Sequence, residues 1–163
     1  MIYRMRAILD TEIDVIRDFE IKATAKLEEL HDSVSQSFGF AGNEMASFYR
    51  SDENWKQGEE MPLFDMGLGS ETFNEKPLNK VLSENENRLI YVYDFLNLWT
   101  FFIELMEITE KDILKDYPSL IFSHGEVPET PPDKDFETEQ GFDKDLNEGS
   151  KSDQDEFEGD QFY

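Results

Sequence analysis

Near its N-terminus the chain alternates apolar and polar side chains with a period of two. The apolar members are Tyr3, Met5, Ala7 and Leu9 in residues 1–9, and Val15, Phe19 and Ile21 in residues 14–21. A period of two is typical of a half-buried β-strand. The pattern therefore predicts two strands that form a hairpin with a turn at residues 10–12.

A helical pattern follows from Thr24 to Phe38. Its apolar residues recur every three or four positions, which places them on one face of a helix; they are Leu27, Leu30, Val34 and Phe38. Thr24 can cap the first turn because its hydroxyl accepts a free N–H there. Gly39 is a natural end. The sequence thus predicts one main helix with an apolar stripe.

The middle of the chain carries weaker signals. Residues 45–49 indicate a short strand, and residues 52–73, rich in Gly, Glu and Met, are typical of a long loop. Pro77 can start a short helix through Leu82, because its fixed φ suits the first helical position.

The strongest strand signal comes next. Residues 89–95 and 98–108 are rich in aromatic and branched side chains, which predicts a hairpin with a tight connection at Leu96-Asn97. Glu104 and Glu107 are three apart on the second strand, so we expect them on opposite faces. Tyr117-Pro118 should close the ordered part.

These elements predict an α+β fold. An antiparallel sheet of about five strands packs on one main helix, in the chain order strand, strand, helix, strand, helix, strand, strand. The folded domain spans residues 1–125. Residues 126–163 contain 14 acidic and 3 basic residues, a net charge of −11, with no apolar period. We expect this acidic C-terminal tail to be disordered.

Charge and composition exclude several functions. The net charge is −23, which repels phosphates, so neither direct nucleic-acid binding nor binding to an anionic membrane is expected. The chain has no cysteine and hence no disulfide, which fits a cytoplasmic protein. It also lacks a signal-peptide pattern and an apolar run long enough to span a bilayer.

Candidate catalytic residues are few. His31 and His124 are the two histidines, and no G-x-S-x-G, P-loop or dinucleotide-binding glycine pattern occurs. We therefore expect no hydrolase triad, no cofactor and no structural metal site. His31, at the edge of the helix stripe, is read as a packed, hydrogen-bonded residue, and a base or ligand is the alternative. Asp94 at the hairpin turn is read mainly as a capping residue.

Two segments resemble a known family. Residues 30–40, LHDSVSQSFGF, are similar to the helix end "L-H-x-x-I-x-x-x-M-G-W" of the Ri-plasmid open-reading-frame-three-like proteins, some of which are described as insertion-sequence passenger proteins. Residues 91–99, YVYDFLNLW, are similar to that family's "Y-x-Y-D-F-G-D-x-W" hairpin, and residues 15–17 align with its "I-W-R" strand. The resemblance spans residues 2–122. It implies a bacterial α+β protein whose sheet packs on the His31 helix, with no established activity.

The resemblance and the residue pattern together give a set of candidate binding residues: His31, Tyr93, Asp94, Trp99 and Arg17. The chain departs from the family at the hairpin, where Leu96-Asn97 replaces Gly-Asp. It also lacks the Cys-Pro-Pro-Glu-Asp-Cys segment after the Tyr-Pro pair. A metal bound by that segment in relatives would be lost here.

Three functional hypotheses follow. The first is a non-enzymatic accessory or protein-interaction protein, with a folded scaffold and a docking or solubilising tail. The second is an enzyme or small-ligand-binding domain with a cleft between the 52–73 loop and the 91–99 hairpin. The third, a mobile-element-associated protein, rests on analogy. Substrate, partner and oligomeric state stay open.

The end of the tail has a pattern of its own. Phe157, Phe162 and Tyr163 stand among carboxylates, so they can fill apolar pockets while the acidic groups meet Lys or Arg. This predicts docking into a basic groove of a partner protein. The alternative is a generic solubilising tail.

Overall fold

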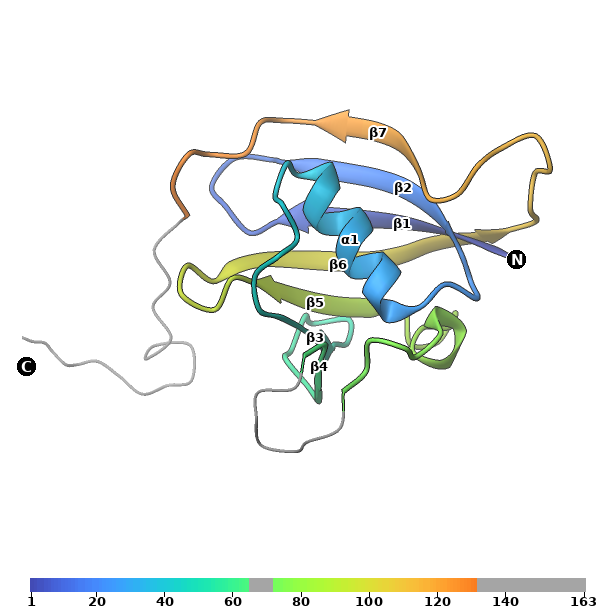
Figure 1. Ribbon diagram of the computed structural model, residues 1–163, viewed down its shortest axis with the longest axis horizontal. Helices are drawn as coiled ribbons and strands as arrows, with labels where there is room; N and C mark the ends of the chain where they lie inside the picture. The colour runs from blue at the N-terminus through green and yellow to red at the C-terminus, as the bar shows by residue number, and fades with distance from the viewer. Residues whose placement is uncertain (65–71, 132–163) are drawn as a thin grey trace, which may run out of the picture. The chain divides into compact units, whose positions relative to one another are not determined.

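The computed structural model describes residues 1–64 and 72–131, which form a mixed α+β fold (Figure 1). Its sheet is antiparallel and has seven strands in the order β4-β3-β5-β6-β1-β2-β7. The strands are β1 (Ile2–Leu9), β2 (Ile16–Lys22), β3 (Ala46–Arg50), β4 (Glu60–Pro62), β5 (Arg88–Tyr93), β6 (Trp99–Thr109) and β7 (Ser119–His124). Helix α1 (Leu27–Ser37) lies across one face of the sheet. The predicted α+β fold class is confirmed, but the predicted number of about five strands was wrong.

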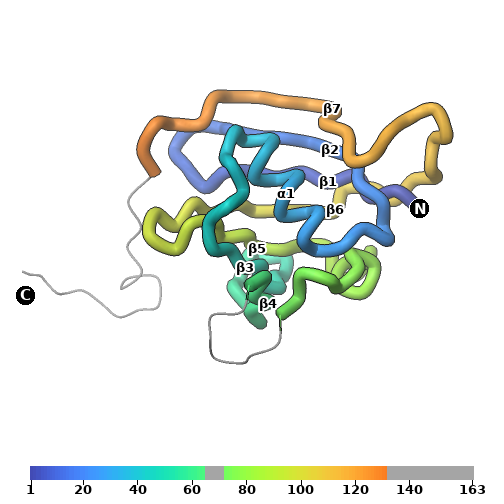
Figure 2. Tube along the Cα trace, in the orientation of Figure 1, coloured from blue at the N-terminus to red at the C-terminus, as the bar shows by residue number. Residues whose placement is uncertain are grey.

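The two strands missed by the pattern lie at the two edges of the sheet. Strand β4 falls inside the predicted 52–73 loop and pairs with β3. Strand β7 follows the Tyr117-Pro118 pair that was expected to end the ordered part, and it pairs with β2 (Figure 2). Both escaped detection because β4 has three residues and β7 is exposed on both faces, so neither shows an alternation.

Helix α1 begins at Leu27, not at Thr24 as predicted. The backbone before it is held by another segment: the carbonyls of Ala23 and Ala25 accept the N–H groups of Asn79 and Leu78. Lys26 is therefore the capping position, and the Glu29 carboxylate accepts its N–H at 3.1 Å. The expected short helix after Pro77 is a single 3-10 turn, η1 (Leu78–Lys80).

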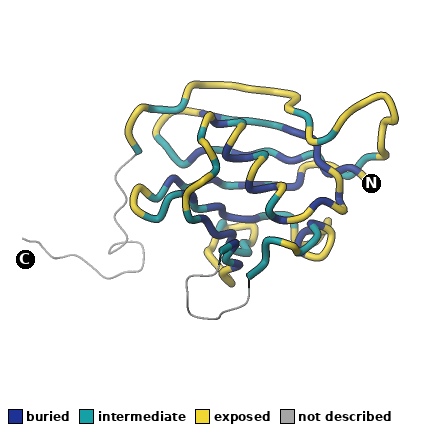
Figure 3. The backbone as a smooth tube through the Cα atoms, viewed as in Figure 1, coloured by how far each residue is buried: buried dark blue, intermediate teal, exposed yellow. Residues whose placement is uncertain are grey.

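The predicted apolar stripe of α1 packs onto the sheet as expected. Leu27, Leu30 and Val34 are buried, and the Phe38 ring lies 4.7 Å from that of Phe101. Figure 3 shows buried backbone under the helix and exposed backbone along β7. The alternation of residues 1–9 is also confirmed, because the odd positions of β1 are buried beneath α1.

The β5–β6 connection is longer than the predicted two-residue turn. It comprises residues 94–98, and the positive φ angles fall on Asp94 (66°) and Leu98 (58°), not on Asn97. The Asp94 carboxylate accepts the N–H of Leu96 at 3.1 Å and the side-chain amide of Asn97 at 2.6 Å. Asp94 therefore stabilises a left-handed turn that the sequence assigned to Asn97.

A bulge in β6 changes the predicted positions of Glu104 and Glu107. The β1–β6 register pairs Arg4 with Glu107 and Arg6 with Glu104, and shifts by one residue between them. The shift leaves Met106 as the extra residue, so Glu104 and Glu107 lie on the same face, against the expectation from their spacing. That face, opposite α1, carries ion pairs between neighbouring strands.

Candidate functional site

His31 lies on the sheet-facing side of α1 and is buried. Its Nδ1 is 2.5 Å from the Tyr91 hydroxyl, and its Nε2 is 3.1 Å from the Gly42 carbonyl. A carbonyl can only accept, so Nε2–H donates to Gly42 and Nδ1 accepts the Tyr91 proton. The Tyr93 hydroxyl in turn accepts the N–H of Gly42 at 3.0 Å. Both ring nitrogens of His31 are thus used inside the core.

Tyr91, on β5, connects this network to the sheet. Its side chain is fully buried, and burial raises the pKa of its hydroxyl far above the ordinary value. The hydroxyl therefore stays protonated and acts as a hydrogen-bond donor. The rings of Phe48 and Phe101 pack at 4.7 and 5.4 Å from its own.

The five candidate binding residues do not form one site. His31 and Tyr93 are neighbours, with ring centroids 6.2 Å apart. Trp99 is paired with Tyr93 across β5 and β6. Asp94 belongs to the turn described above. Arg17 lies on β2, where it contacts Ser37 and Phe38 at the C-terminal end of α1. The predicted cleft between the 52–73 loop and the hairpin stays a prediction, because residues 65–71 lie outside the described residues.

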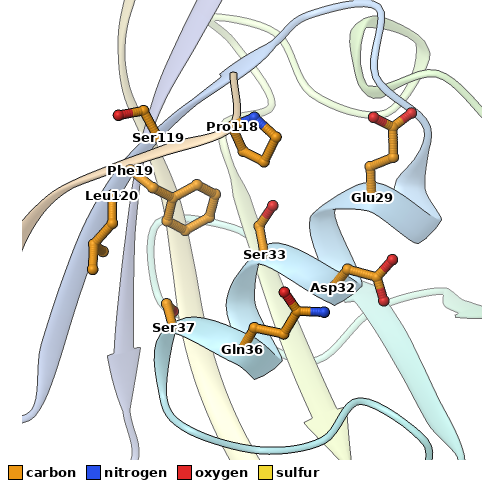
Figure 4. Close-up of a pocket in the computed structure, with 9 residues that line it drawn as sticks. All are labelled: Phe19, Glu29, Asp32, Ser33, Gln36, Ser37, Pro118, Ser119 and Leu120. Carbon is orange, nitrogen blue, oxygen red and sulfur yellow. The ribbon is translucent and has the colours of Figure 1, made fainter. Parts of the chain in front are cut away.

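A groove of about 380 Å³ lies elsewhere, between α1 and the β2–β7 edge of the sheet (Figure 4). We call it the α1–β7 groove, and its lining residues are Phe19, Glu29, Asp32, Ser33, Gln36, Ser37, Pro118, Ser119 and Leu120. The helix contributes polar side chains, whereas β2 and the start of β7 contribute mainly apolar ones. One wall of the groove is therefore polar and acidic, and the other is apolar.

Two carboxylates, of Glu29 and Asp32, dominate the electrostatics of this groove. No lysine or arginine lines it. Nε2 of His31 lies 3.9 Å from Asp32, and its hydrogen is donated to Gly42. Glu29 accepts the backbone N–H of Lys26, whose ammonium forms its ion pair with Glu75. Among the described residues, neither groove carboxylate therefore forms an ion pair with a lysine or arginine.

Ser33 adds an unused hydrogen-bonding group. Its Oγ is buried and has no hydrogen-bond partner among the described residues. In Figure 4 the hydroxyl lies between the helix and the Pro118 wall. Buried polar atoms almost always have partners, so a ligand group or water is the expected partner for this hydroxyl.

Arg17 frames the groove without lining it. Its Nε donates to the Ser37 carbonyl at 2.9 Å, and its Nη1 donates to the His124 carbonyl at 3.0 Å. Its guanidinium also lies 5.0 Å from the centre of the Phe38 ring. Burial lowers the pKa of Arg17. One side chain therefore ties β2 to the end of α1 and to β7, which fixes the two walls of the groove.

The family model described as "Plasmid pRiA4b ORF-3-like protein" matches residues 2–160. The chain belongs to this family. No curated protein matches the sequence. The family membership confirms the resemblance seen in the helix and hairpin segments.

A solved structure supports the fold. A crystal structure of a protein of unknown function from Methanosarcina mazei Go1 superposes with a TM-score of 0.68 at 15% sequence identity, covering 78% of this chain and 72% of that chain. At this identity the likeness shows the fold alone. Neither this relative nor the family supplies an activity.

One wall of the groove has a partial signal in the sequence. Glu29, Asp32, Ser33 and Gln36 recur at spacings of three and four, which places them on one face of α1. A polar helix face opposite an apolar stripe is ordinarily solvated, so this spacing alone does not indicate a groove. The opposing wall could not be inferred, because it comes from Phe19 and from residues 118–120, more than 80 residues away in sequence.

Within residues 1–64 and 72–131, no group of three or more His, Asp or Glu side chains is placed to hold a metal ion. In the same part of the chain, no helix is long and apolar enough to cross a membrane. Phe157, Phe162 and Tyr163 lie outside the described residues, so docking by the tail stays a prediction.

Proposed function

We propose that this protein is a non-enzymatic accessory protein that binds a cationic group of a ligand or partner in the α1–β7 groove. One observation carries the proposal: the carboxylates of Glu29 and Asp32, which form no ion pair with a lysine or arginine of the described residues, line the same groove as the unpartnered hydroxyl of Ser33. A guanidinium or ammonium on an aliphatic stem matches this arrangement. The cation meets the carboxylates, while the stem covers Phe19 and Leu120.

The charge of the whole chain supports a cationic ligand. A net charge of −23 attracts cations over long distances and repels nucleic acid and anionic lipid. The plasmid in the family's description supports an association with mobile elements by analogy alone. Such a role would then act through a basic protein, not through direct contact with nucleic acid. We place it in the cytoplasm, in line with a chain that has no cysteine.

The arrangement of α1 argues for binding over nucleophilic catalysis. Ser33 is the buried hydroxyl of the groove, and a serine nucleophile needs an adjacent base. His31 stands two residues earlier in the helix, about 200° away around its axis, and both of its nitrogens are used in the core. His124, at the other end of β7, does not line the groove. Among the described residues, no histidine base therefore lines the groove beside Ser33.

The first prediction tests the groove with butylguanidinium, a cation on a short apolar stem. Titration of the ¹⁵N-labelled full-length protein should shift the amide resonances of residues 29–37, 119 and 120, with saturation in the millimolar range expected of so small a ligand. Butyrate, which carries the opposite charge, should leave them in place.

Substitutions then locate the charge. The double variant Glu29→Gln, Asp32→Asn should weaken binding about tenfold, because it removes two charged acceptors and keeps the side-chain shapes. The matched control is Glu28→Gln, Glu84→Gln, which removes the same charge from a half-buried and an exposed position outside the groove and should bind like wild type. Equal weakening in both variants would show that general charge, not the groove, attracts the cation.

A further inference from the structure

Strand β7 forms an open edge of the sheet. It pairs with β2 on one side, and no strand of the described residues pairs with its other side. Its sequence, SLIFSH, contains no Asp, Glu, Lys or Arg. Three consecutive apolar side chains are exposed in it: Leu120 (52%), Ile121 (43%) and Phe122 (47%). An uncharged apolar edge is unusual in a chain that is so acidic.

The opposite edge of the same sheet is protected. Strand β4 has three residues, and it contains Glu60 and Pro62. Short length, charge, proline and β-bulges are devices that keep edge strands from pairing with other chains. Strand β7 is twice as long and carries neither charge nor proline; its one such device is a bulge at Ile121, where its register with β2 shifts. Apart from the His124 carbonyl, which accepts a hydrogen bond from Arg17, the outward backbone N–H and C=O groups of β7 are therefore available to another strand.

We infer that β7 is the docking edge for an extended, basic segment of a partner protein, which joins the sheet as an additional strand. The occupant is chosen by charge and so rests on the proposed function of the groove. The chain's own residues 126–163, with 14 acidic and 3 basic residues, do not complement an acidic groove. A second copy carries another −23 charges and is repelled.

The register explains why a basic segment with apolar residues fits. Leu120 lies opposite Phe19 in the β2–β7 pairing and lines the α1–β7 groove, whereas Phe122 lies opposite Asp18 on the other face. A strand added to β7 would run about 4.8 Å beyond it, with side chains alternating between these faces. An Arg or Lys stem on the helix side can cross Leu120 toward Asp32. An apolar residue on the other side can cover Phe122.

The second prediction uses the full-length protein and a blocked eight-residue peptide that alternates Arg and Val. We expect this peptide to bind about tenfold more tightly than the same peptide with alternate backbone nitrogens methylated, which keeps every charge but loses the N–H donors of one edge. A Glu-Val peptide should not bind. Fluorescence anisotropy of labelled peptides measures all three. Equal affinity of the Arg-Val peptide and its methylated form would overturn edge pairing.

Protein variants separate this inference from the proposed function. The double variant Phe122→Thr, Ile121→Thr keeps strand propensity and removes apolar surface. It should therefore bind the Arg-Val peptide more weakly than wild type and bind butylguanidinium equally well. The double variant Glu29→Gln, Asp32→Asn should bind both the peptide and butylguanidinium more weakly than wild type. If butylguanidinium binds and the methylated peptide binds as tightly as its parent, the proposed cation binding in the groove is supported and the docking of a strand on β7 is wrong. If the parent peptide binds equally to wild type and to the carboxylate variant, charge selection by the groove is wrong.

Sedimentation equilibrium gives the remaining outcome. The protein should be monomeric at concentrations where the peptide binds. A dimer that dissociates in the Phe122→Thr, Ile121→Thr variant would show that the edge is occupied by a second copy, and would overturn the assignment to a basic partner.

Discussion

At the scale of single residues, His31 shows how a residue typical of active sites serves the core instead. Its two ring nitrogens are hydrogen-bonded to Tyr91 and to the Gly42 carbonyl, and its ring also packs edge-on against Phe64. The network joins the helix, the sheet and the 39–45 connection. Its role is therefore to fix how α1 sits on the sheet, and so to fix the groove on the other side of the helix.

The third prediction concerns the loss of the Tyr91 hydroxyl from this network. Tyr91→Phe should lower the free energy of unfolding by about 1–3 kcal/mol, because it leaves the buried Nδ1 of His31 without a donor. Tyr49→Phe, on the opposite side of neighbouring β3 and partly exposed, should change it by less than about 0.5 kcal/mol. Urea denaturation measures both. A silent Tyr91→Phe variant would mean that His31 finds another donor.

Residue types alone could identify which side chains matter but not what they contact. Asp94 was expected to cap a turn, and its carboxylate does accept two hydrogen bonds there. The function of Arg17 could not be inferred, because its acceptors are carbonyls at the ends of α1 and β7. Such acceptors have no side-chain signature. The role of Ser33 could not be inferred either, because Pro118, which lines the same groove, is distant in sequence.

At the scale of elements, ion pairs on the face opposite α1 hold neighbouring strands in register. Arg4 on β1 contacts Glu20 on β2 at 2.8 Å and Glu107 on β6 at 2.6 Å. Lys115, in the β6–β7 connection, reaches the other oxygen of Glu20 at 3.3 Å. Glu20 is buried with these partners. It therefore links the central strands to the segment that leads into β7.

The fourth prediction follows from the charge of Glu20. Hydrogen bonds from Arg4, with a smaller contribution from Lys115, hold the pKa of Glu20 below its ordinary value. A carboxyl with a lowered folded-state pKa stabilises the fold above its unfolded pKa of about 4.3, and this contribution is lost as the pH falls toward the folded value. The stability difference between wild type and Glu20→Gln should therefore be largest near neutral pH and shrink below about pH 4.3.

Urea denaturation between pH 3 and pH 7 tests this sign. Glu28→Gln, at a half-buried position of α1 outside this ion-pair network, serves as the control and should track wild type over the whole range. A difference for Glu20→Gln that grows toward acid pH would contradict the assignment of Glu20 as a stabilising carboxylate.

Elements with one buried face were predictable, and elements without one were not. The β1–β2 hairpin, α1 and the β5–β6 hairpin each bury a stripe of large side chains, so their period is visible in the sequence. Strand β7 exposes residues on both faces and derives its structure from backbone pairing with β2. Strand β7 also forms one wall of the groove. The edge that we assign to a partner was thus the part hardest to infer from sequence.

At the scale of the whole molecule, negative charge selects the partner before contact. The −23 net charge divides almost equally between residues 1–125 (−12) and residues 126–163 (−11). Fields of this kind raise the rate of encounter with cations and are screened by salt. The acidic tail and the acidic groove therefore favour the same class of partner, although they occupy different parts of the chain.

The fifth prediction separates this steering from contact by the tail. Replacing Asp153, Asp155, Glu156, Glu158 and Asp160 with the matching amides changes the net charge from −23 to −18. At about 0.01 M salt, where the Debye length is about 30 Å, the variant should bind the Arg-Val peptide with a lower association rate constant. At about 1 M salt, where it is about 3 Å, the two rates should converge. The dissociation rate constant should be unchanged, because steering acts before the complex forms.

The matched control for that experiment keeps every charge and removes the aromatic rings, by Phe157→Ser, Phe162→Ser and Tyr163→Ser. Stopped-flow fluorescence should give wild-type association and dissociation rates for this control if the tail acts through its charge. Faster dissociation from the control would show that the rings contact the peptide, which is the behaviour expected of a docking tail. Faster dissociation from the amide variant, with an unchanged association rate, would rule out steering, because the charges would then act only within the complex.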